Sequence, residues 1–110
     1  MRVAVIGAAG FVGQNLLAEL EGTDHTVIAC DVQPMETPEA VESRQLDITD
    51  AGAVDALVGE VDAVAHLAAH PLPASLEAPV FDAEINIMGS LNLLDAARRH
   101  GLEKLVFASA

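Results

Sequence analysis

Apolar and polar positions alternate along the chain in two different periods. Short apolar runs, several of them rich in β-branched residues and typical of buried strands, recur four times, and the more polar stretch over residues 43–46 is interpreted as a further short strand. Between them, apolar residues recur at spacings of three and four, which is the period of a helix that covers a core. We expect strands at about residues 2–6, 25–30, 43–46, 61–67 and 104–108, and helices at about residues 10–20, 50–58 and 81–100.

Strands that alternate with helices predict an α/β fold, with a parallel sheet and helices on both faces. Right-handed crossovers and a switch after the first strand give the strand order 3-2-1-4-5. Residues 32–42 hold Pro34 and Pro38 and should form a surface loop. At 110 residues the chain is one domain at most, so residues 1–110 are interpreted as a single unit.

The turn after the first strand carries three glycines in the spacing Gly7-x-x-Gly10-x-x-Gly13. Gly7 permits a tight turn out of the strand, and Gly13 permits close packing of the helix on the strand. Gly10 lets a pyrophosphate approach the backbone, while the helix N-terminus directs N–H groups at the phosphates. The alternative is a structural glycine turn that binds nothing.

Asp31 follows the second strand, 18 residues after Gly13. This is the expected place for an acid that hydrogen-bonds the ribose of a dinucleotide, so we predict a Rossmann-type dinucleotide site. No arginine follows Asp31 until Arg44. An acid without a nearby cation repels a 2′-phosphate, which favours NAD over NADP.

Other polar residues allow more than one interpretation. Asp47 ends a strand where α/β sheets bind ligands, although it could be a turn or capping acid. Thr49 or Asp50 should cap the following helix. His66 ends a buried strand and is expected to pack in the core, whereas His70, in the loop that follows, is a weaker candidate for substrate contact.

The net charge is −12, from 17 acidic and 5 basic residues, so the surface is expected to be strongly acidic. Such a surface disfavours binding to nucleic acid and to anionic membranes. The composition resembles that of proteins from salt-loving organisms, in which salt screens the repulsion between acids. An ordinary acidic enzyme is the alternative. No apolar run is long enough to span a bilayer and no signal peptide precedes the first strand, so we expect a cytoplasmic protein. Cys30 is the single cysteine and should be a buried hydrophobe, and the histidines lack metal-ligand spacing, so no metal is expected.

The whole chain resembles the N-terminal part of extended short-chain dehydrogenases/reductases, the NAD-dependent epimerase/dehydratase family. Six features agree in order: the glycine motif, the acid at 31, Asp47-Ile48, the His66-Leu67-Ala68-Ala69 signature, the helix that begins at Asn86, and the final strand. In that family Asp47-Ile48 corresponds to the pair that holds the adenine. The resemblance implies cofactor contacts from Gly7, Ala9, Gly10, Phe11, Val12, Gly13, Asp31, Asp47, Ile48, Leu67, Ala68, Ala69 and Asn86.

The resemblance also implies where the chemistry would lie. Ser109 falls near the catalytic hydroxyl, although a residue beyond Ala110 could supply it instead. The family's Tyr-x-x-x-Lys would also lie beyond Ala110, because these 110 residues include no tyrosine and only one lysine, Lys104. We therefore expect an incomplete Rossmann-type domain that stops before the catalytic helix, without a substrate domain.

By resemblance, the chain is the NAD-binding half of an NAD-dependent sugar or nucleotide-sugar epimerase or dehydratase. A simple sugar or uronate dehydrogenase of the same superfamily is one alternative, and a non-catalytic dinucleotide-binding module is another. The helix over residues 81–100 has an apolar surface wider than one sheet contact requires, and the family suggests a homodimer through it.

Overall fold

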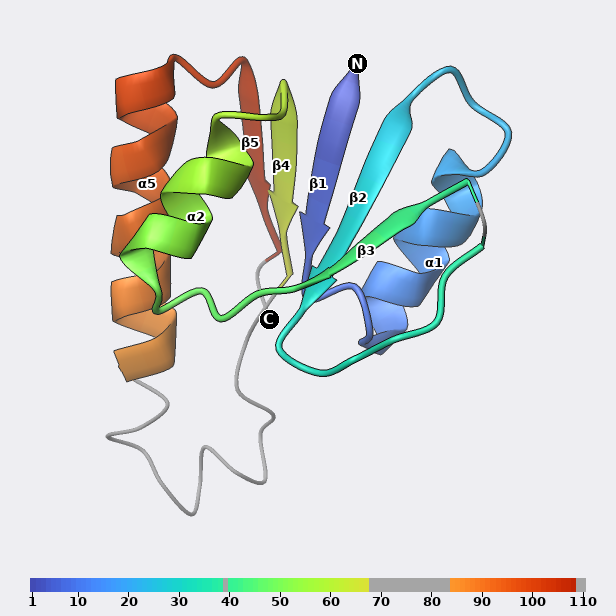
Figure 1. Cartoon of the computed structure of the whole chain (residues 1–110), viewed down its shortest axis with the longest axis horizontal. Coiled ribbons are helices and arrows are strands. Elements are labelled where there is room, and N and C mark those ends of the chain that lie inside the picture. The colour runs from blue at the N-terminus through green and yellow to red at the C-terminus, as the bar shows by residue number, and fades with distance from the viewer. Residues whose placement is uncertain (39, 68–83, 109–110) are drawn as a thin grey trace.

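The computed structural model describes residues 1–38, 40–67 and 84–108 of the chain. The elements, in chain order, are β1 (Arg2–Ile6), α1 (Phe11–Leu20), β2 (Thr26–Asp31), β3 (Glu42–Gln45), α2 (Ala51–Val58), β4 (Ala63–His66), η1 (Glu84–Met88), α5 (Gly89–His100) and β5 (Lys104–Phe107). Helices follow β1, β3 and β4 along the chain, and the five strands form one parallel sheet (Figure 1).

The strand order is β3-β2-β1-β4-β5, which confirms the order predicted from the crossover rules. The register places Ile6 of β1 beside Cys30 of β2 on one side and His66 of β4 on the other. His66 in turn lies beside Phe107 of β5. The carboxyl ends of β1, β2, β4 and β5 therefore lie along one edge of the sheet, at the bottom of Figure 1.

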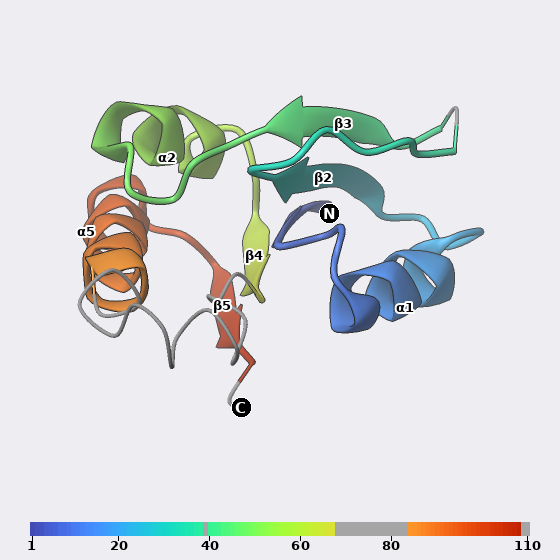
Figure 2. The same ribbon diagram turned by 90° about the horizontal axis from the view of Figure 1, so that it is seen from below.

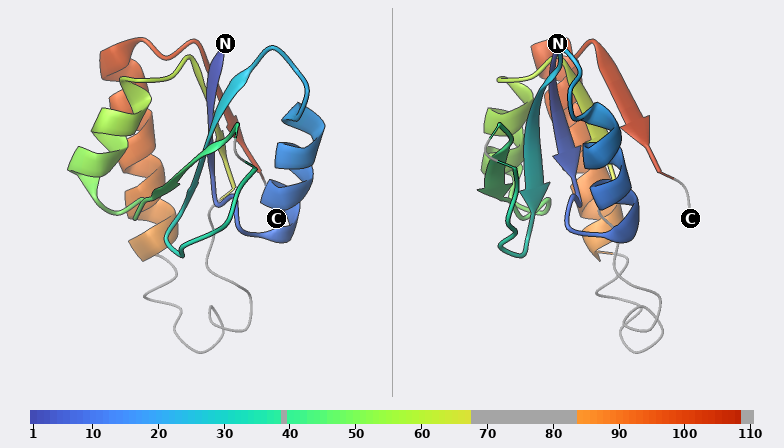
Figure 3. Two further views of the ribbon diagram at one scale, coloured as in Figure 1. Left: turned by 45° about the vertical axis from the view of Figure 1, so that its right-hand side comes forward. Right: turned by 90° about the vertical axis from the view of Figure 1, so that its right-hand side faces the viewer.

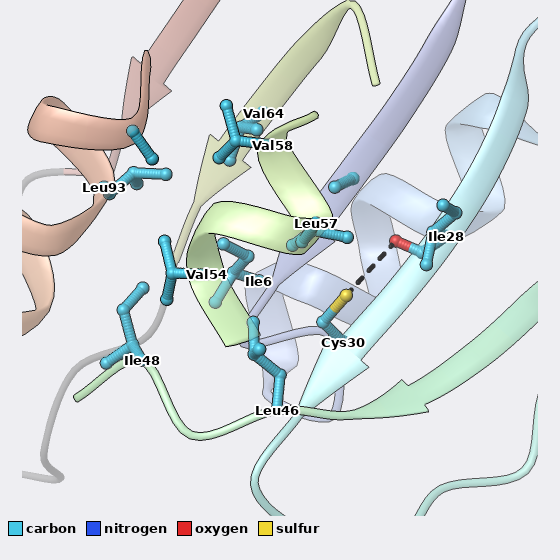
Figure 4. Packing of buried hydrophobic residues seen from close by; sticks show 12 residues of the cluster. Ile6, Ile28, Cys30, Leu46, Ile48, Val54, Leu57, Val58, Val64 and Leu93 are labelled. Atoms are coloured by element: carbon cyan, nitrogen blue, oxygen red, sulfur yellow. Dashed lines mark hydrogen bonds between the residues drawn. The ribbon is translucent and has the colours of Figure 1, made fainter. Parts of the chain in front are cut away.

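Helices cover the two faces of the sheet unequally. Helices α2 and α5 pack against each other on one face, and α1 lies on the opposite face beside β1 and β2 (Figures 2 and 3). The larger core cluster fills the space between the sheet and the α2–α5 pair, and ten of its members are labelled in Figure 4. A smaller cluster beneath α1 consists of Val5, Ala8, Leu17, Val27 and Ala29.

Cys30 belongs to the larger cluster and is fully buried, which confirms its interpretation as a packed residue. Its thiol points toward the carbonyl oxygen of Ile28, 3.9 Å away. Burial raises the pKa of the Cys30 thiol to about 12, so the nucleophilic thiolate form is scarce at neutral pH.

Element boundaries differ from the expected ones by one or two residues, for identifiable reasons. Asp31 lies inside β2 because its carbonyl oxygen accepts the N–H of Leu46 at 2.9 Å, which prolongs the pairing with β3. Gly10 is the N-cap of α1 and not its first helical residue. Asp50 caps α2 by accepting the N–H of Ala53, as one of the two predicted caps. Directly before α5 lies the π-helical turn η1, whose hydrogen bonds span five residues.

Candidate functional site

The predicted site residues within the described chain gather along the carboxyl edge of the sheet. The glycine turn follows β1, Asp31 ends β2, Asp47 comes two residues after β3, and Leu67 follows β4. Backbone hydrogen bonds continue past the strand ends, as the Leu67 N–H donates to the Ile6 carbonyl at 2.8 Å. In open α/β sheets this edge is where ligands bind, so the tertiary structure assembles these residues where a ligand would be held.

The glycine turn is tied to the end of β2 through one carbonyl group. The N–H groups of Gly7 and Ala8 both donate to the carbonyl oxygen of Cys30, at 2.8 and 3.0 Å. Gly7 has a φ of 86°, in the left-handed region that L-residues other than glycine seldom adopt. The turn then brings the chain back, with the Gly10 N–H 3.3 Å from the Gly7 carbonyl oxygen. Gly7 thus performs the turn that the sequence assigns to it.

Gly10 and Gly13 are glycines for different reasons. A Cβ on Gly13 would lie 2.5 Å from the Gly7 carbonyl oxygen and 2.6 Å from the Cα of Ala8, so α1 packs on the loop only without it. A Cβ on Gly10 would meet only the Gly7 oxygen, at an ordinary 3.6 Å. Gly10 is also exposed and has a φ of −74° that any residue can adopt. The folded chain therefore has room for a side chain at 10, and its absence leaves the loop backbone open to a ligand.

The N-terminus of α1 presents its first N–H groups beside this open backbone. The cap residue Gly10 supplies no side-chain hydrogen bond to the helix. The first N–H groups of a helix have no acceptor within the helix, and they carry the positive end of its dipole. Phe11 and Val12 are 85% and 57% exposed, so the first turn faces solvent. This arrangement suits an anionic group such as a pyrophosphate.

Asp31 joins the glycine loop to the segment after β2. One carboxylate oxygen accepts the Ala9 N–H and the other accepts the Gln33 N–H, both at 3.0 Å. The acid is thus held by two backbone donors in a defined position next to the loop. Each carboxylate oxygen can accept a second hydrogen bond, which leaves capacity for the hydroxyl groups of a ribose. The contact between residues 9 and 31 has no signal in the local sequence.

Asp47 is exposed and is oriented by its own turn. Its Oδ1 accepts both the backbone N–H and the hydroxyl of Thr49, at 2.9 and 2.7 Å. These bonds, the hydroxyl first, hold the pKa of the Asp47 carboxyl below its usual range, so it is ionised at neutral pH. The Asp47 carboxylate thus bonds within its own turn, while its role toward a ligand stays a prediction. Its Oδ2 has no partner among residues 1–38, 40–67 and 84–108. Ile48 follows with its side chain in the core, 3% exposed.

His66 lies at the carboxyl end of β4 but inside the protein. Its side chain is 6% exposed, and its ring lies 5.2 Å from that of Phe107, tilted by 37°. Burial lowers the pKa of His66, and its buried Nε2 has no hydrogen-bond partner in the described part of the chain. The expected core histidine is confirmed, because desolvation keeps this ring neutral rather than poised as a charged base.

Several predicted residues lie outside the described part of the chain. These are Ala68 and Ala69 of the proposed cofactor contacts, His70, and the candidate hydroxyl Ser109. Asn86 is described and lies exposed in η1, before α5. Its place after β4 in the chain agrees with a role at this edge, which stays a prediction.

The described residues form neither a metal centre nor a membrane-spanning helix. Those residues contain no cluster of three or more His, Cys, Asp or Glu side chains that could hold a metal ion. Among the same residues, no helix combines the length and the apolar character that a bilayer span requires.

Several known proteins are similar to this chain in sequence, and solved structures are similar to it in fold. The model of the NAD dependent epimerase/dehydratase family matches residues 3–110. The UDP-glucose 4-epimerase of Mycolicibacterium smegmatis is 33% identical over 121 residues, which cover 100% of this chain and 39% of that protein. The L-arabinose 1-dehydrogenase (NAD(P)(+)) of Haloferax volcanii is 38% identical, over 98% of this chain and 40% of that one.

A solved structure agrees with these sequence matches. The UDP-glucose 4-epimerase of Thermus thermophilus, crystallised in complex with NAD, superposes with a TM-score of 0.89 at 38% identity. The match covers 100% of this chain and 38% of that one. The chain therefore spans less than half the length of each of these relatives.

Proposed function

The chain belongs to the NAD-dependent epimerase/dehydratase family, and on that premise we propose that it is the NAD-binding half of an oxidoreductase that acts on a sugar or a nucleotide sugar. The observation that supports this most directly is the open backbone at Gly10, set against the N-terminus of α1 and beside Asp31. These features suit a dinucleotide, whose pyrophosphate needs N–H donors and whose ribose needs an acceptor.

Three groups of residues along the sheet edge would each bind a different part of NAD. The turn from Gly7 to Gly13 would hold the pyrophosphate, and Asp31 would accept hydrogen bonds from the adenosine ribose. Asp47 and Ile48 would hold the adenine, the first through its carboxylate and the second through its backbone. NAD supplies the acceptor for a hydride taken from a sugar hydroxyl in this family.

The catalytic groups that the resemblance implies differ from the residues proposed to bind NAD. The resemblance assigns the acid/base role to a Tyr-x-x-x-Lys pair, and these 110 residues contain no tyrosine. Ser109 is the one proposed catalytic residue within the chain, as the hydroxyl beside the reacting sugar. Within these 110 residues the proposal therefore concerns cofactor binding, with Ser109 as the candidate group for the chemical step.

A simple sugar or uronate dehydrogenase is the second candidate. It is favoured by the Haloferax volcanii relative, a sugar dehydrogenase that matches this chain at 38% identity. Epimerases and dehydratases return the hydride to the sugar, whereas dehydrogenases release it with the reduced cofactor. The NAD-binding half is common to both candidates.

Asp31 should make the protein select NAD over NADP. We expect the dissociation constant for NAD to be lower by about tenfold to a hundredfold, because a ribose hydroxyl donates to the carboxylate and a 2′-phosphate is repelled. In the Asp31→Asn variant the preference should shrink about tenfold, since the negative charge is lost. Titration calorimetry with both cofactors measures the two constants.

Asp24→Asn is the matched control for this experiment. Asp24 is an exposed acid before β2, at the opposite end of the strand from Asp31. Loss of the charge at Asp24 should leave the preference for NAD over NADP unchanged. Equal affinities of the wild-type protein for NAD and NADP would contradict the role of Asp31, and absence of NAD binding would contradict the proposed function.

We also propose that the protein forms a homodimer through the helix that the sequence predicts over residues 81–100, of which the structure describes η1 and α5. Its described part exposes four large apolar side chains, namely Ile87, Met88, Leu91 and Leu94, each between 48% and 59% exposed. Apolar groups gathered on one helix face in this way are typical of a surface that a partner covers. The two η1–α5 segments would then pack against each other.

Leu91→Asp should convert the dimer into a monomer. Burying an unpaired carboxylate at an apolar interface is unfavourable, so association is expected to weaken strongly. Light scattering coupled to size-exclusion chromatography gives the mass, and Val32→Asp, at a residue with 61% exposure outside this face, is the control. A monomeric wild-type protein, or an unchanged mass in the Leu91 variant, would contradict this interface.

A further inference from the structure

Helix α5 contacts the turn that carries Asp47 and Ile48. The side-chain amide of Asn92 donates to the carbonyl oxygen of Ile48 at 3.0 Å, across 44 residues of sequence. Asn92 is half-buried and lies one helical turn after the start of α5. The contact therefore connects the last helix to the segment that the proposed function places at the adenine.

Gly89 makes a second contact from α5 to the same residue. A Cβ at position 89 would lie 2.6 Å from the Cγ2 of Ile48 and 3.0 Å from its Cγ1. The absence of a side chain thus lets the helix backbone pack directly on Ile48. That isoleucine lies in the core between α2 and α5, near Val54 and Leu93 (Figure 4). Both its backbone carbonyl and its side chain are consequently fixed by α5.

The polar side of the turn is ordered independently. Thr49 donates twice to Oδ1 of Asp47, and the Asp50 N–H donates to the Asp47 carbonyl oxygen at 3.0 Å. Asp50 in turn caps α2. Local bonds therefore orient the Asp47 carboxylate relative to its turn, while α5 sets where the turn as a whole lies relative to the sheet.

We propose that Asn92 and Gly89 are positioning residues for adenine recognition: they act through Ile48 to hold the Asp47 carboxylate and the Ile48 N–H where the edge of the base can reach them. This inference rests on the proposed function, which assigns the adenine to that turn. An adenine offers a donor in its amino group and an acceptor at N1. A carboxylate and a backbone N–H, held side by side, complement that pair.

The test compares NAD with its hypoxanthine analogue, deamino-NAD. Hypoxanthine has a carbonyl oxygen in place of the amino group and a proton on N1, so both hydrogen bonds are reversed. We expect wild-type protein to bind NAD more tightly than deamino-NAD by at least about tenfold, because a hydrogen bond to a charged group is lost and polar groups are left unpaired. The pyrophosphate and ribose contacts are the same for both ligands.

Asn92→Leu removes the donor to Ile48 at similar side-chain size. In this variant we expect the affinity for NAD to fall about tenfold while that for deamino-NAD changes little, so that the preference largely disappears. Gly89→Ala displaces Ile48 by steric contact and should reduce the preference in the same direction. Thr37→Val is the control, because the Thr37 hydroxyl also donates to a backbone carbonyl, that of Val41 at 2.8 Å, and neither residue belongs to the proposed cofactor contacts.

The ratio of the affinities for NAD and deamino-NAD distinguishes a positioning role of Asn92 from a general loss of stability. A purely structural role of Asn92 would lower the affinities for NAD and deamino-NAD by the same factor, and that result would overturn the inference. Circular dichroism establishes that each variant is folded, and Asn92→Ser serves if the leucine variant is not. A wild-type protein that binds NAD without preference over deamino-NAD overturns both this inference and the adenine assignment. Failure of the wild-type protein to bind NAD contradicts the proposed function itself.

Discussion

Gly13→Ala is expected to lower the midpoint of thermal unfolding by roughly 10 °C. The added Cβ would lie 2.5 to 2.7 Å from three backbone atoms, namely the carbonyl oxygens of Gly7 and Ala8 and the Cα of Ala8. No side-chain rotation relieves contact with backbone, so α1 must move away from the loop, at a cost of about 3 kcal/mol. Alanine is a better helix former than glycine by about 1 kcal/mol, which offsets only part of that cost.

Gly52→Ala provides the matched control for this stability effect. Gly52 lies in α2, where a Cβ would have its nearest contact at 3.6 Å, with Oδ1 of Asp50. The same substitution should therefore leave stability unchanged or raise it by up to about 1 kcal/mol. Thermal unfolding followed by circular dichroism compares the two variants. If Gly13→Ala melts at or above the wild-type temperature, α1 does not pack on the loop as described.

Gly10→Val should abolish NAD binding and leave the protein folded. A Cβ at position 10 meets only the Gly7 oxygen, at 3.6 Å, so the fold accommodates the side chain. The branched chain would instead occupy the exposed space above the loop, where the pyrophosphate should approach. Loss of two hydrogen bonds to the charged phosphates corresponds to a weakening of about a hundredfold or more.

Calorimetric titration with NAD measures this loss, and circular dichroism shows whether the fold persists. Gly10→Ala is the graded comparison, with a smaller loss of affinity expected from the smaller side chain. The Gly10 variants are expected to lose NAD affinity and stay folded, whereas Gly13→Ala is expected to lose stability. Compared in this way, the variants show that Gly10 is required by the ligand and Gly13 by the fold. Unchanged NAD affinity in Gly10→Val would place the cofactor elsewhere on the protein.

Strand order and the general position of the site follow from local features of the chain. Apolar runs such as residues 3–6 favour burial, and the crossover rules then give the order of the five strands. Gly7, Asp31 and Asp47 could be assigned to one edge because each follows a predicted strand, and parallel strands end on the same side. The sequence limited the cap of α2 to Thr49 or Asp50, since a capping side chain bonds within its own turn, and the structure identifies Asp50.

The family resemblance extended this interpretation to residues that periodicity alone does not mark. It assigned the adenine to Asp47 and Ile48, and it singled out Asn86 in the segment after β4. The structure places Asp47 at the sheet edge and Asn86 at the surface. Their contacts with a cofactor remain predictions that the binding experiments test.

Only the tertiary structure decided which atoms meet across the sheet edge. The Ala9 N–H bonds to the Asp31 carboxylate, and Asn92 bonds to the Ile48 carbonyl, between residues far apart in the chain. The different requirements at Gly10 and Gly13 likewise depend on how α1 lies on the loop. A sequence specifies period and local turns because neighbouring residues determine them, whereas these contacts depend on how the crossovers bring separate elements together. The sequence by itself thus determined a parallel α/β sheet with a glycine turn and two acids at one edge, and packing decided which of those residues serve the fold and which are left open to a ligand.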